Sequence, residues 1–342
     1  MRFIPTGLAV ILTFAAVPAF AQSQVVTVYS ADGLHDGSPN WFQTEFDAFT
    51  KATGIKVQYV ENGAGVTVNR VAAQKNNQQA DVLVTNPPFI QMAAADGLLA
   101  PYTPANAAPH IPAVTRSRKD LYWPLVNDYF AFIYDKAALP AAPATFADFL
   151  APSLKGKFQY STPGEAGDGT AMMQESFHIF GSKAAGFDYL GKLQVNNVGP
   201  SSSTGRLAAL VNKGEIDVSN GDVQMNLSQE AEDPNIRIFI PAGPNGVRTT
   251  LPNPYYIALV KSAPHPEAAK KLIDFLLSQH AQMQVSAIAY GYPVRTDVHP
   301  TDANYATLEA TLKGVKIWYP DWSQVAATLS HDVSTWHQVT GS

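Results

Sequence analysis

The sequence predicts an α/β protein of two lobes, with two mixed sheets flanked by helices, a hinge and a cleft between the lobes. Short β-branched segments alternate with helical segments in two separate series along the chain. Two apolar, aromatic segments at 121–135 and 248–261 join the two series, and we expect the chain to cross between the lobes there. The 342 residues are enough for two such units.

The first series begins with 25–29, a β-branched run typical of a buried strand. A helix follows from Trp41 and stops at Gly54, with Ser38 as its expected N-cap and Pro39 as its first position. Further strands are predicted at 55–60 and 81–85, and a further helix at 66–75. This alternation indicates a mainly parallel sheet with helices on its faces.

A surface loop rich in Pro, Ala and Asn is predicted at 101–120, and one long central strand at 121–134. The second series then has predicted strands at 158–160, 216–218 and 236–240 and predicted helices at 170–181, 183–193 and 206–213. A third aromatic strand is expected at 255–260, an amphipathic helix at 266–277 and C-terminal helices after Thr301. We therefore expect lobe 1 to comprise 25–125 plus about 252–300, and lobe 2 about 126–251 plus 301–342.

The N-terminal segment 1–21 has the pattern of a secretory signal peptide. One cation, Arg2, precedes an apolar run at 7–17 that is too short to span a bilayer, and Ala19 and Ala21 form an Ala-x-Ala cleavage site. We expect cleavage after Ala21 and a free periplasmic protein.

Composition excludes several classes of protein. The chain has no cysteine, which excludes disulfide frameworks, thiolate zinc sites and cysteine nucleophiles. The 23 Lys and Arg residues are outnumbered by 28 Asp and Glu residues, and there is no long basic block, which argues against a nucleic-acid partner.

Two loops rich in hydroxyl groups each precede a predicted helix. The first, 161–170, also contains glycines that let a ligand approach the backbone, and the second is 201–205. Hydroxyls and the N–H groups of a helix N-terminus bind phosphate or phosphonate without a local cation. The first loop has no Lys at Thr170, so it does not match a nucleotide-binding loop. Simple turns and capping remain the alternative.

A cation-binding end is predicted from acidic and aromatic residues near strand ends. Asp222 follows a predicted strand, and Asp32 and Asp36 lie in the loop after the first strand. Tyr129 and Tyr255 lie on the proposed crossings, where they are placed to contact a ligand. The alternatives are solvated loop acids and tyrosines that only pack in the core.

Catalysis and metal binding are poorly supported by the sequence, so we expect no enzyme and no cofactor. There is no H-E-x-x-H and no G-x-S-x-G motif. His178 lies in a predicted helix beside Phe177 and Phe180 and is expected to pack in the core. His35, in a glycine-rich loop, is a candidate for contact with a ligand or metal. The remaining histidines lack metal-ligand spacing.

Long segments of the mature chain resemble one family. They include VVTVYSADGLHDGSPNWFQTEFDAFTKATGI, FQYSTPGEAGDGTA, YLGKLQVNNVGPSSSTGRLAALVNKGEI and SNGDVQMNL. The chain resembles the periplasmic 2-aminoethylphosphonate-binding proteins of ABC importers, and more distantly the ferric-iron, thiamine and polyamine binders of the two-lobed periplasmic class. The resemblance implies a class II periplasmic-binding-protein fold that closes on its ligand, a monomer, and delivery to a membrane permease and its ATPase subunit.

The resemblance and the residues together imply a ligand with phosphonate at one end and ammonium at the other. The phosphonate would be held by Ser161, Thr162, Gly169, Thr170, Ser203 and Thr204. The residues expected to bind the amine, or to close over the ligand from the other lobe, are Ser30, Asp32, His35, Asp36, Asn86, Tyr129, Asp222 and Tyr255.

Ferric iron, another small anion or zwitterion, and phosphoester hydrolysis are the alternatives. Ferric-binding relatives place a tyrosine pair shortly after the segment corresponding to 214–217, whereas 219–225 of this chain contains no tyrosine and Tyr255-Tyr256 lies too far along. The metal-binding and nucleophile motifs that a secreted hydrolase would need are not found in the sequence.

Overall fold

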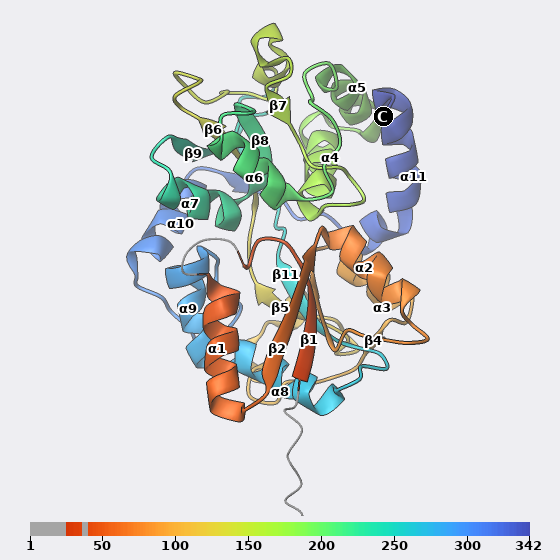
Figure 1. Cartoon of the computed structure of the whole chain (residues 1–342). Helices are drawn as coiled ribbons and strands as arrows, with labels where there is room; N and C mark the ends of the chain where they lie inside the picture. The colour runs from red at the N-terminus through yellow and green to blue at the C-terminus, as the bar shows by residue number, and fades with distance from the viewer. Residues whose placement is uncertain (1–24, 36–39) are drawn as a thin grey trace, which may run out of the picture.

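The structure is a computed structural model that describes residues 25–35 and 40–342. Its strands form two larger sheets, one above the other in Figure 1, with helices packed around each. The predicted signal peptide, Asp36, Ser38 and Pro39 lie outside the described residues. Within the described part of the chain, no helix is long and apolar enough to cross a membrane.

The first sheet has six strands in the order β2-β1-β3-β11-β4, with β5 also paired to β11. These strands are β1 (Val25–Ala31), β2 (Lys56–Asn62), β3 (Val82–Thr85), β4 (Leu99–Ala100), β5 (Trp123–Val126) and β11 (Tyr255–Val260). Strand β1 is parallel to β2 and β3, and Val28 lies opposite both Tyr59 and Val82. Strand β11 returns late in the sequence and is antiparallel to β3, so the sheet is mixed.

Five helices surround this sheet: α1 (Trp41–Thr53), α2 (Ala64–Ala73), α3 (Phe89–Ala95), α8 (Pro266–Leu276) and α9 (Gln279–Ala289). Helix α1 begins where the Asn40 side chain accepts a hydrogen bond from the Gln43 N–H at 2.8 Å. The expectation of a Ser38 cap was wrong, because the helix begins two residues later. Helix α1 ends at Gly54, whose φ of 73° lies in the left-handed region.

The second sheet has the order β7-β8-β6-β9. Its strands are β6 (Phe130–Asp135), β7 (Phe158–Gln159), β8 (Val218–Asp222) and β9 (Ile236–Phe239), and its helices are α4 (Gly167–Ile179), α5 (Lys183–Leu193), α6 (Thr204–Asn212) and α7 (Val223–Glu232). The polar segment ending at Asp222, expected to follow a strand, is itself most of β8. Short 3₁₀ turns lie at Ala108–His110 and Ala113–Thr115 in the predicted surface loop, and at Asp148–Leu150 and Pro152–Leu154.

The expectation of one long strand at 121–134 was wrong, because β5 and β6 belong to different sheets. The chain passes between the sheets at 127–129, where the Asn127 N–H bonds to the Tyr292 carbonyl at 2.9 Å and leaves the strand direction. The return crossing contains β10 (Thr249–Thr250). The two crossings are joined, since the Phe130 N–H bonds to the Leu251 carbonyl and the Asn253 N–H to the Asp128 carbonyl.

The C-terminal segment contains α10 (Ala303–Leu312), β12 (Lys316–Ile317) and α11 (Trp322–Thr340). Strand β12 pairs with β10 at the return crossing. Helix α11 packs against both α5 and α3, so it touches elements of both sheets (Figure 1). The residue limits of the lobes stated above remain a prediction.

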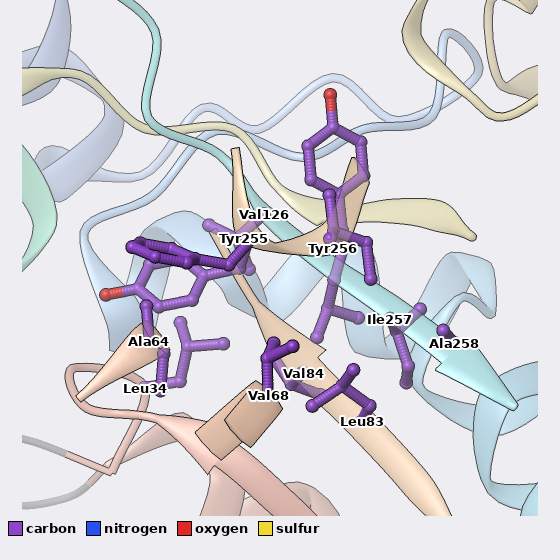
Figure 2. Packing of buried hydrophobic residues seen from close by; sticks show 14 of the residues in the cluster. Leu34, Ala64, Val68, Leu83, Val84, Val126, Tyr255, Tyr256, Ile257 and Ala258 are labelled. Atoms are coloured by element: carbon purple, nitrogen blue, oxygen red, sulfur yellow. The ribbon is translucent and has the colours of Figure 1, made fainter. Parts of the chain in front are cut away.

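Strand β11 lies at the centre of the largest core cluster, which contains residues of both sheets. Tyr255 and Tyr256 stand on opposite sides of this strand, and Leu34 and Ala64 lie beside Tyr255 (Figure 2). Both tyrosines are buried. This packing places the Tyr255 hydroxyl at the junction of the two sheets, beside the acidic residues described next.

Candidate ligand site between the two sheets

Four aspartates gather between the sheets, each supplied by a different element. Asp32 follows β1, Asp128 lies in the first crossing, Asp168 is in the first turn of α4, and Asp222 ends β8. Asp128, Asp168 and Asp222 are buried. Because strand ends and helix starts meet at this junction, acids far apart in the sequence come together.

Tyr255 links two of these acids across the junction. Its hydroxyl lies 3.2 Å from Asp222 Oδ2 and 2.9 Å from the main-chain oxygen of Asp32. Asp222 Oδ1 also accepts the Met225 N–H at 2.7 Å and so caps α7. Tyr255 was predicted to contact a ligand, and it contacts the residues around the proposed amine site.

Asp128 and Asp168 are held by polar neighbours of the same junction. Asp128 Oδ1 accepts the N–H groups of Tyr129 at 2.7 Å and Gln224 at 3.1 Å. Asp168 Oδ1 accepts the Asn253 side-chain amide at 2.7 Å. These contacts orient the carboxyl groups but bring no positive charge.

Negative charge at this site is uncompensated by the protein. In the described part of the chain, none of the four aspartates forms an ion pair with Lys, Arg or His. Burial raises the pKa of Asp128 to about 7, and the nearby charge of Asp168 adds to the rise. Burial, followed by the charge of a neighbouring aspartate, also raises the pKa of Asp168 and of Asp222 well above the usual range. A cation beside these carboxyl groups would lower their pKa values again, because it favours the ionised form.

Three buried oxygen atoms at the junction lack a hydrogen-bond donor among the described residues: Asp128 Oδ2, Gln224 Oε1 and Asn253 Oδ1. The Gln224 amide nitrogen is already used, since it donates to the Gly33 carbonyl at 3.2 Å. Buried polar atoms are nearly always satisfied in native proteins, so these acceptors are open to donors from a ligand or from water.

The hydroxyls of the first loop mostly form hydrogen bonds within this loop and with neighbouring segments, including the second loop. Ser161 Oγ accepts bonds from Asn220 and Thr204, both at 3.1 Å. Thr162 Oγ1 accepts the Ser201 N–H at 2.9 Å, and Thr170 Oγ1 accepts the Gly164 N–H at 3.0 Å. Both loops are therefore fixed against each other at the N-terminal ends of α4 and α6.

Gly169 serves close packing of α4 onto the first loop. A Cβ atom at this position would lie 2.3 Å from the Ser161 carbonyl oxygen. The glycine thus fits a tight backbone contact. Its role in ligand binding remains a prediction, as do those of Ser161, Thr162 and Thr170.

An anion already lies at the N-terminus of α6. Ser203 caps this helix, and its hydroxyl donates to Asp32 Oδ2 at 2.6 Å. The Gly205 N–H donates to the same Asp32 oxygen at 3.1 Å, and the Thr204 N–H also contacts this carboxylate. Donors at the predicted anion pocket of Ser203 and Thr204 are therefore used by Asp32, and the role of these two residues in binding an anion remains a prediction.

The family model for bacterial extracellular solute-binding proteins matches residues 34–283. The chain belongs to this family. A protein of Salmonella paratyphi A, provisionally named a 2-aminoethylphosphonate-binding periplasmic protein, is 56% identical over the whole of both chains. The thiamine-binding periplasmic protein of Salmonella typhimurium is 23% identical over 93% of this chain and 98% of its own.

Solved structures agree on the fold of this solute-binding protein. The periplasmic binding protein AfuA from Actinobacillus pleuropneumoniae, with fructose-6-phosphate bound, has a TM-score of 0.77 at 19% identity, covering 93% of this chain and 99% of that one. At this identity the likeness supports the fold alone. It confirms the predicted two-lobed periplasmic-binding-protein architecture.

The two lobes of this solute-binding protein are in contact. The Gly65 N–H at the start of α2 donates to the Glu165 carbonyl at 2.8 Å. A Cβ atom on Gly63 would lie 1.9 Å from the Ser202 carbonyl oxygen, so glycine allows this approach. The elements around the two sheets are therefore in direct contact at this edge of the acid cluster.

Other predicted site residues lie around this cluster or apart from it. The Asn86 side chain donates to the carbonyls of Asn253 and Pro254 in the return crossing, and Ser30 Oγ donates to the Ala31 carbonyl at 2.7 Å. His35 stacks on Tyr59 with ring centroids 4.9 Å apart, and Tyr129 packs edge-on against Tyr292. Their roles in binding remain predictions.

His178 was expected in the core, but it is exposed on α4 and stacks on Trp318 with ring centroids 4.2 Å apart. Sequence reasoning also missed Asp128, Asp168, Gln224 and Asn253. Asp128 had a usable signal, since an Asn-Asp pair interrupts an otherwise apolar, aromatic segment. Asp168 lies within the first hydroxyl-rich loop, where only the hydroxyl residues and Gly169 were predicted to bind a ligand.

Proposed function

We propose that this protein is the substrate-binding component of an ABC importer, and that it captures 2-aminoethylphosphonate in the periplasm and delivers it to the membrane permease. The name of the Salmonella relative, at 56% identity over the full length, supports the ligand. The ligand joins an ammonium group to a phosphonate group through two carbon atoms. The site offers a region for each charge.

The uncompensated acid cluster carries the proposal. Buried carboxylates are ordinarily paired with a cation, and here the described residues supply none to Asp128, Asp168 or Asp222. An ammonium group supplies one positive charge and three N–H donors. Gln224 Oε1 and Asn253 Oδ1, which lack donors, add neutral acceptors for it.

The phosphonate would bind at the N-terminal ends of α4 and α6. No side chain caps α4, and Thr204 at the start of α6 contacts both Ser161 and Asp168. The Asp32 carboxylate holds the α6 donors in the described structure, so the phosphonate would replace it there or share those donors with it. Helix N-termini favour anions through their free N–H groups and dipole.

A thermal-shift series on the purified protein tests this function. We expect 2-aminoethylphosphonate to raise the melting midpoint, since a ligand at a hundredfold excess over its Kd adds about 2.7 kcal/mol. Ethylphosphonate, ethanolamine and phosphate should each give a much smaller shift, because each lacks one charged end. An equal shift with ethylphosphonate would refute the amine half of the site. No shift with 2-aminoethylphosphonate would refute the function.

Ferric iron has weaker support. A relative in Synechocystis named iron uptake protein A1 is 27% identical over 81% of this chain. Among the described residues, however, no three His, Asp or Glu side chains are placed to hold one metal ion. Ferric citrate belongs in the same thermal-shift series, where a shift with iron alone would favour this alternative.

A further inference from the structure

The carboxyl groups of Asp128 and Asp222 both lie at the N-terminus of α7. Each accepts main-chain N–H groups on its Oδ1 atom: Asp128 from Tyr129 and Gln224, and Asp222 from Met225. Asp128 Oδ2 has no donor among the described residues. Two buried carboxyl groups at one helix end, with no cation beside them among the described residues, are stabilised when one of them carries a proton.

The surroundings of this pair add no positive charge. The titratable groups that face it from the neighbouring elements are Asp32 after β1, Asp168 on α4, Tyr255 on β11 and the adjacent Tyr129. All four are acidic groups. Both aspartates of the pair are 1% exposed, so water screens them little. Two bare charges at this place would repel each other and Asp168.

We propose that Asp128 and Asp222 hold one proton between them in the ligand-free protein and release it when a cationic ligand group arrives. The inference rests on the proposed function for the identity of that group, the ammonium of 2-aminoethylphosphonate. The O–H proton of the pair passes to solvent, and the ammonium keeps its own three protons. The charge of the pair changes from −1 to −2, which the ammonium offsets by +1, so the pair together with the ammonium keeps a net charge of −1.

Isothermal titration in two buffers with different ionisation enthalpies, PIPES and HEPES, measures the proton release at pH 6. We expect the wild-type protein to release about one proton from the pair for each 2-aminoethylphosphonate bound. Release from the ligand's own phosphonate adds to this number. The Asp128→Asn variant separates the two sources, because it removes the shared proton and leaves the phosphonate unchanged.

Three variants make the measurement specific. Asp128→Asn and Asp222→Asn should each lower the released proton count by about one, and both keep the shape of the side chain. Asparagine also remains a good N-cap for α7 at position 222. Glu175→Gln is the matched control. Glu175 is buried and hydrogen-bonded to Thr249 and Trp318, outside the aspartate cluster. The number of protons that the Glu175→Gln variant releases on binding should therefore equal that of the wild type.

The ligand-free protein gives a second, independent readout. The pKa of Asp128 is about 7 in the folded protein and 3.8 ordinarily, so the folded state binds more protons between these values. The stability contributed by the proton is full below pH of about 4 and is lost as the pH rises through about 7. The melting midpoint of the wild type, relative to Asp128→Asn, should therefore fall between pH 4 and 8.

The outcomes separate this inference from the proposed function. Binding of 2-aminoethylphosphonate with the same proton release in the wild type and Asp128→Asn overturns the release and leaves the function standing. Absence of binding overturns the function and the release together. The pH readout then decides whether the pair holds a proton, and parallel melting curves for the wild type and Asp128→Asn would show that it does not.

Discussion

The buried acids between the lobes differ from the buried acids elsewhere in the molecule. Asp332 on α11 is 1% exposed and lies 2.6 Å from the Lys183 ammonium, and Asp81 accepts the Thr27 N–H together with the His265 N–H and ring. Asp128 and Asp222 are equally buried, but their nearest charged neighbours are other acids.

This contrast separates acids with structural partners from the acids that we propose bind the ligand. An acid with its own donors inside the protein is stable as an ion and has no need of a ligand. An acid that faces other acids lowers the stability of the ligand-free protein, and a cationic ligand removes that cost. The predictions below test this contrast and the packing around the acids.

The largest expected effect is on ligand affinity. Asp222→Ala should weaken binding of 2-aminoethylphosphonate by roughly 100-fold, because it removes a desolvated charge that faces the ammonium. Asp332→Ala, the matched change in a structural acid, should alter affinity by less than about threefold. Isothermal titration measures both. Unchanged affinity in Asp222→Ala would remove this residue from the site.

Closure of the lobes can be tested without touching any acid. Gly63→Ala should weaken binding by about tenfold, because its Cβ would lie 1.9 Å from the Ser202 carbonyl oxygen and keep the lobes apart. With the ligand present, small-angle scattering should show a larger radius of gyration for Gly63→Ala than for the wild type. Gly243→Ala, where the added Cβ would meet only side chains, Ile179 at 3.3 Å and Asn245 at 3.5 Å, is the control. Wild-type affinity in Gly63→Ala would show that binding does not need this contact.

Stability without ligand should move in opposite directions for the two kinds of acid. Asp168→Asn should raise the free energy of unfolding at pH 7 by roughly 1–2 kcal/mol, because burial and the charges of Asp222 and Asp32 disfavour its ionised form. Asp332→Asn should lower it by about 1–2 kcal/mol through loss of the bond to Lys183, a half-exposed partner. Urea unfolding measures both. Destabilisation by Asp168→Asn would contradict the comparison.

The smallest effect is expected at Tyr129. Its ring packs against Tyr292, and among the described residues its hydroxyl forms no hydrogen bond with an acid of the cluster, although Asp128 lies nearby. Tyr129→Phe should therefore change affinity by less than about threefold, whereas Tyr255→Phe, which loses the bond to Asp222, should weaken it by roughly tenfold. A large loss in Tyr129→Phe would restore the sequence-based prediction that Tyr129 contacts the ligand.

Much of the fold could be predicted from local pattern. The strand at Tyr255–Val260 and the helix at Lys183–Leu193 have the predicted limits, because their runs of apolar residues and flanking turn residues mark both ends. The break between β5 and β6 was missed, since residues on both sides are aromatic and apolar. Only the hydrogen bonds of Asn127 and Phe130 to other segments show that the chain changes sheets there.

The sequence by itself determined the α/β class, the two crossings and the family, and it singled out three residues that meet between the sheets, Asp32, Asp222 and Tyr255. These follow from periodicity, from residue types at strand ends and from long matching segments. The tertiary structure alone decided that Asp128 and Asp168 join them, because it brings together acids 40 residues apart in the chain. It also decided that the cluster lacks a cation and that loop hydroxyls bond to each other, since both depend on which side chains meet after folding.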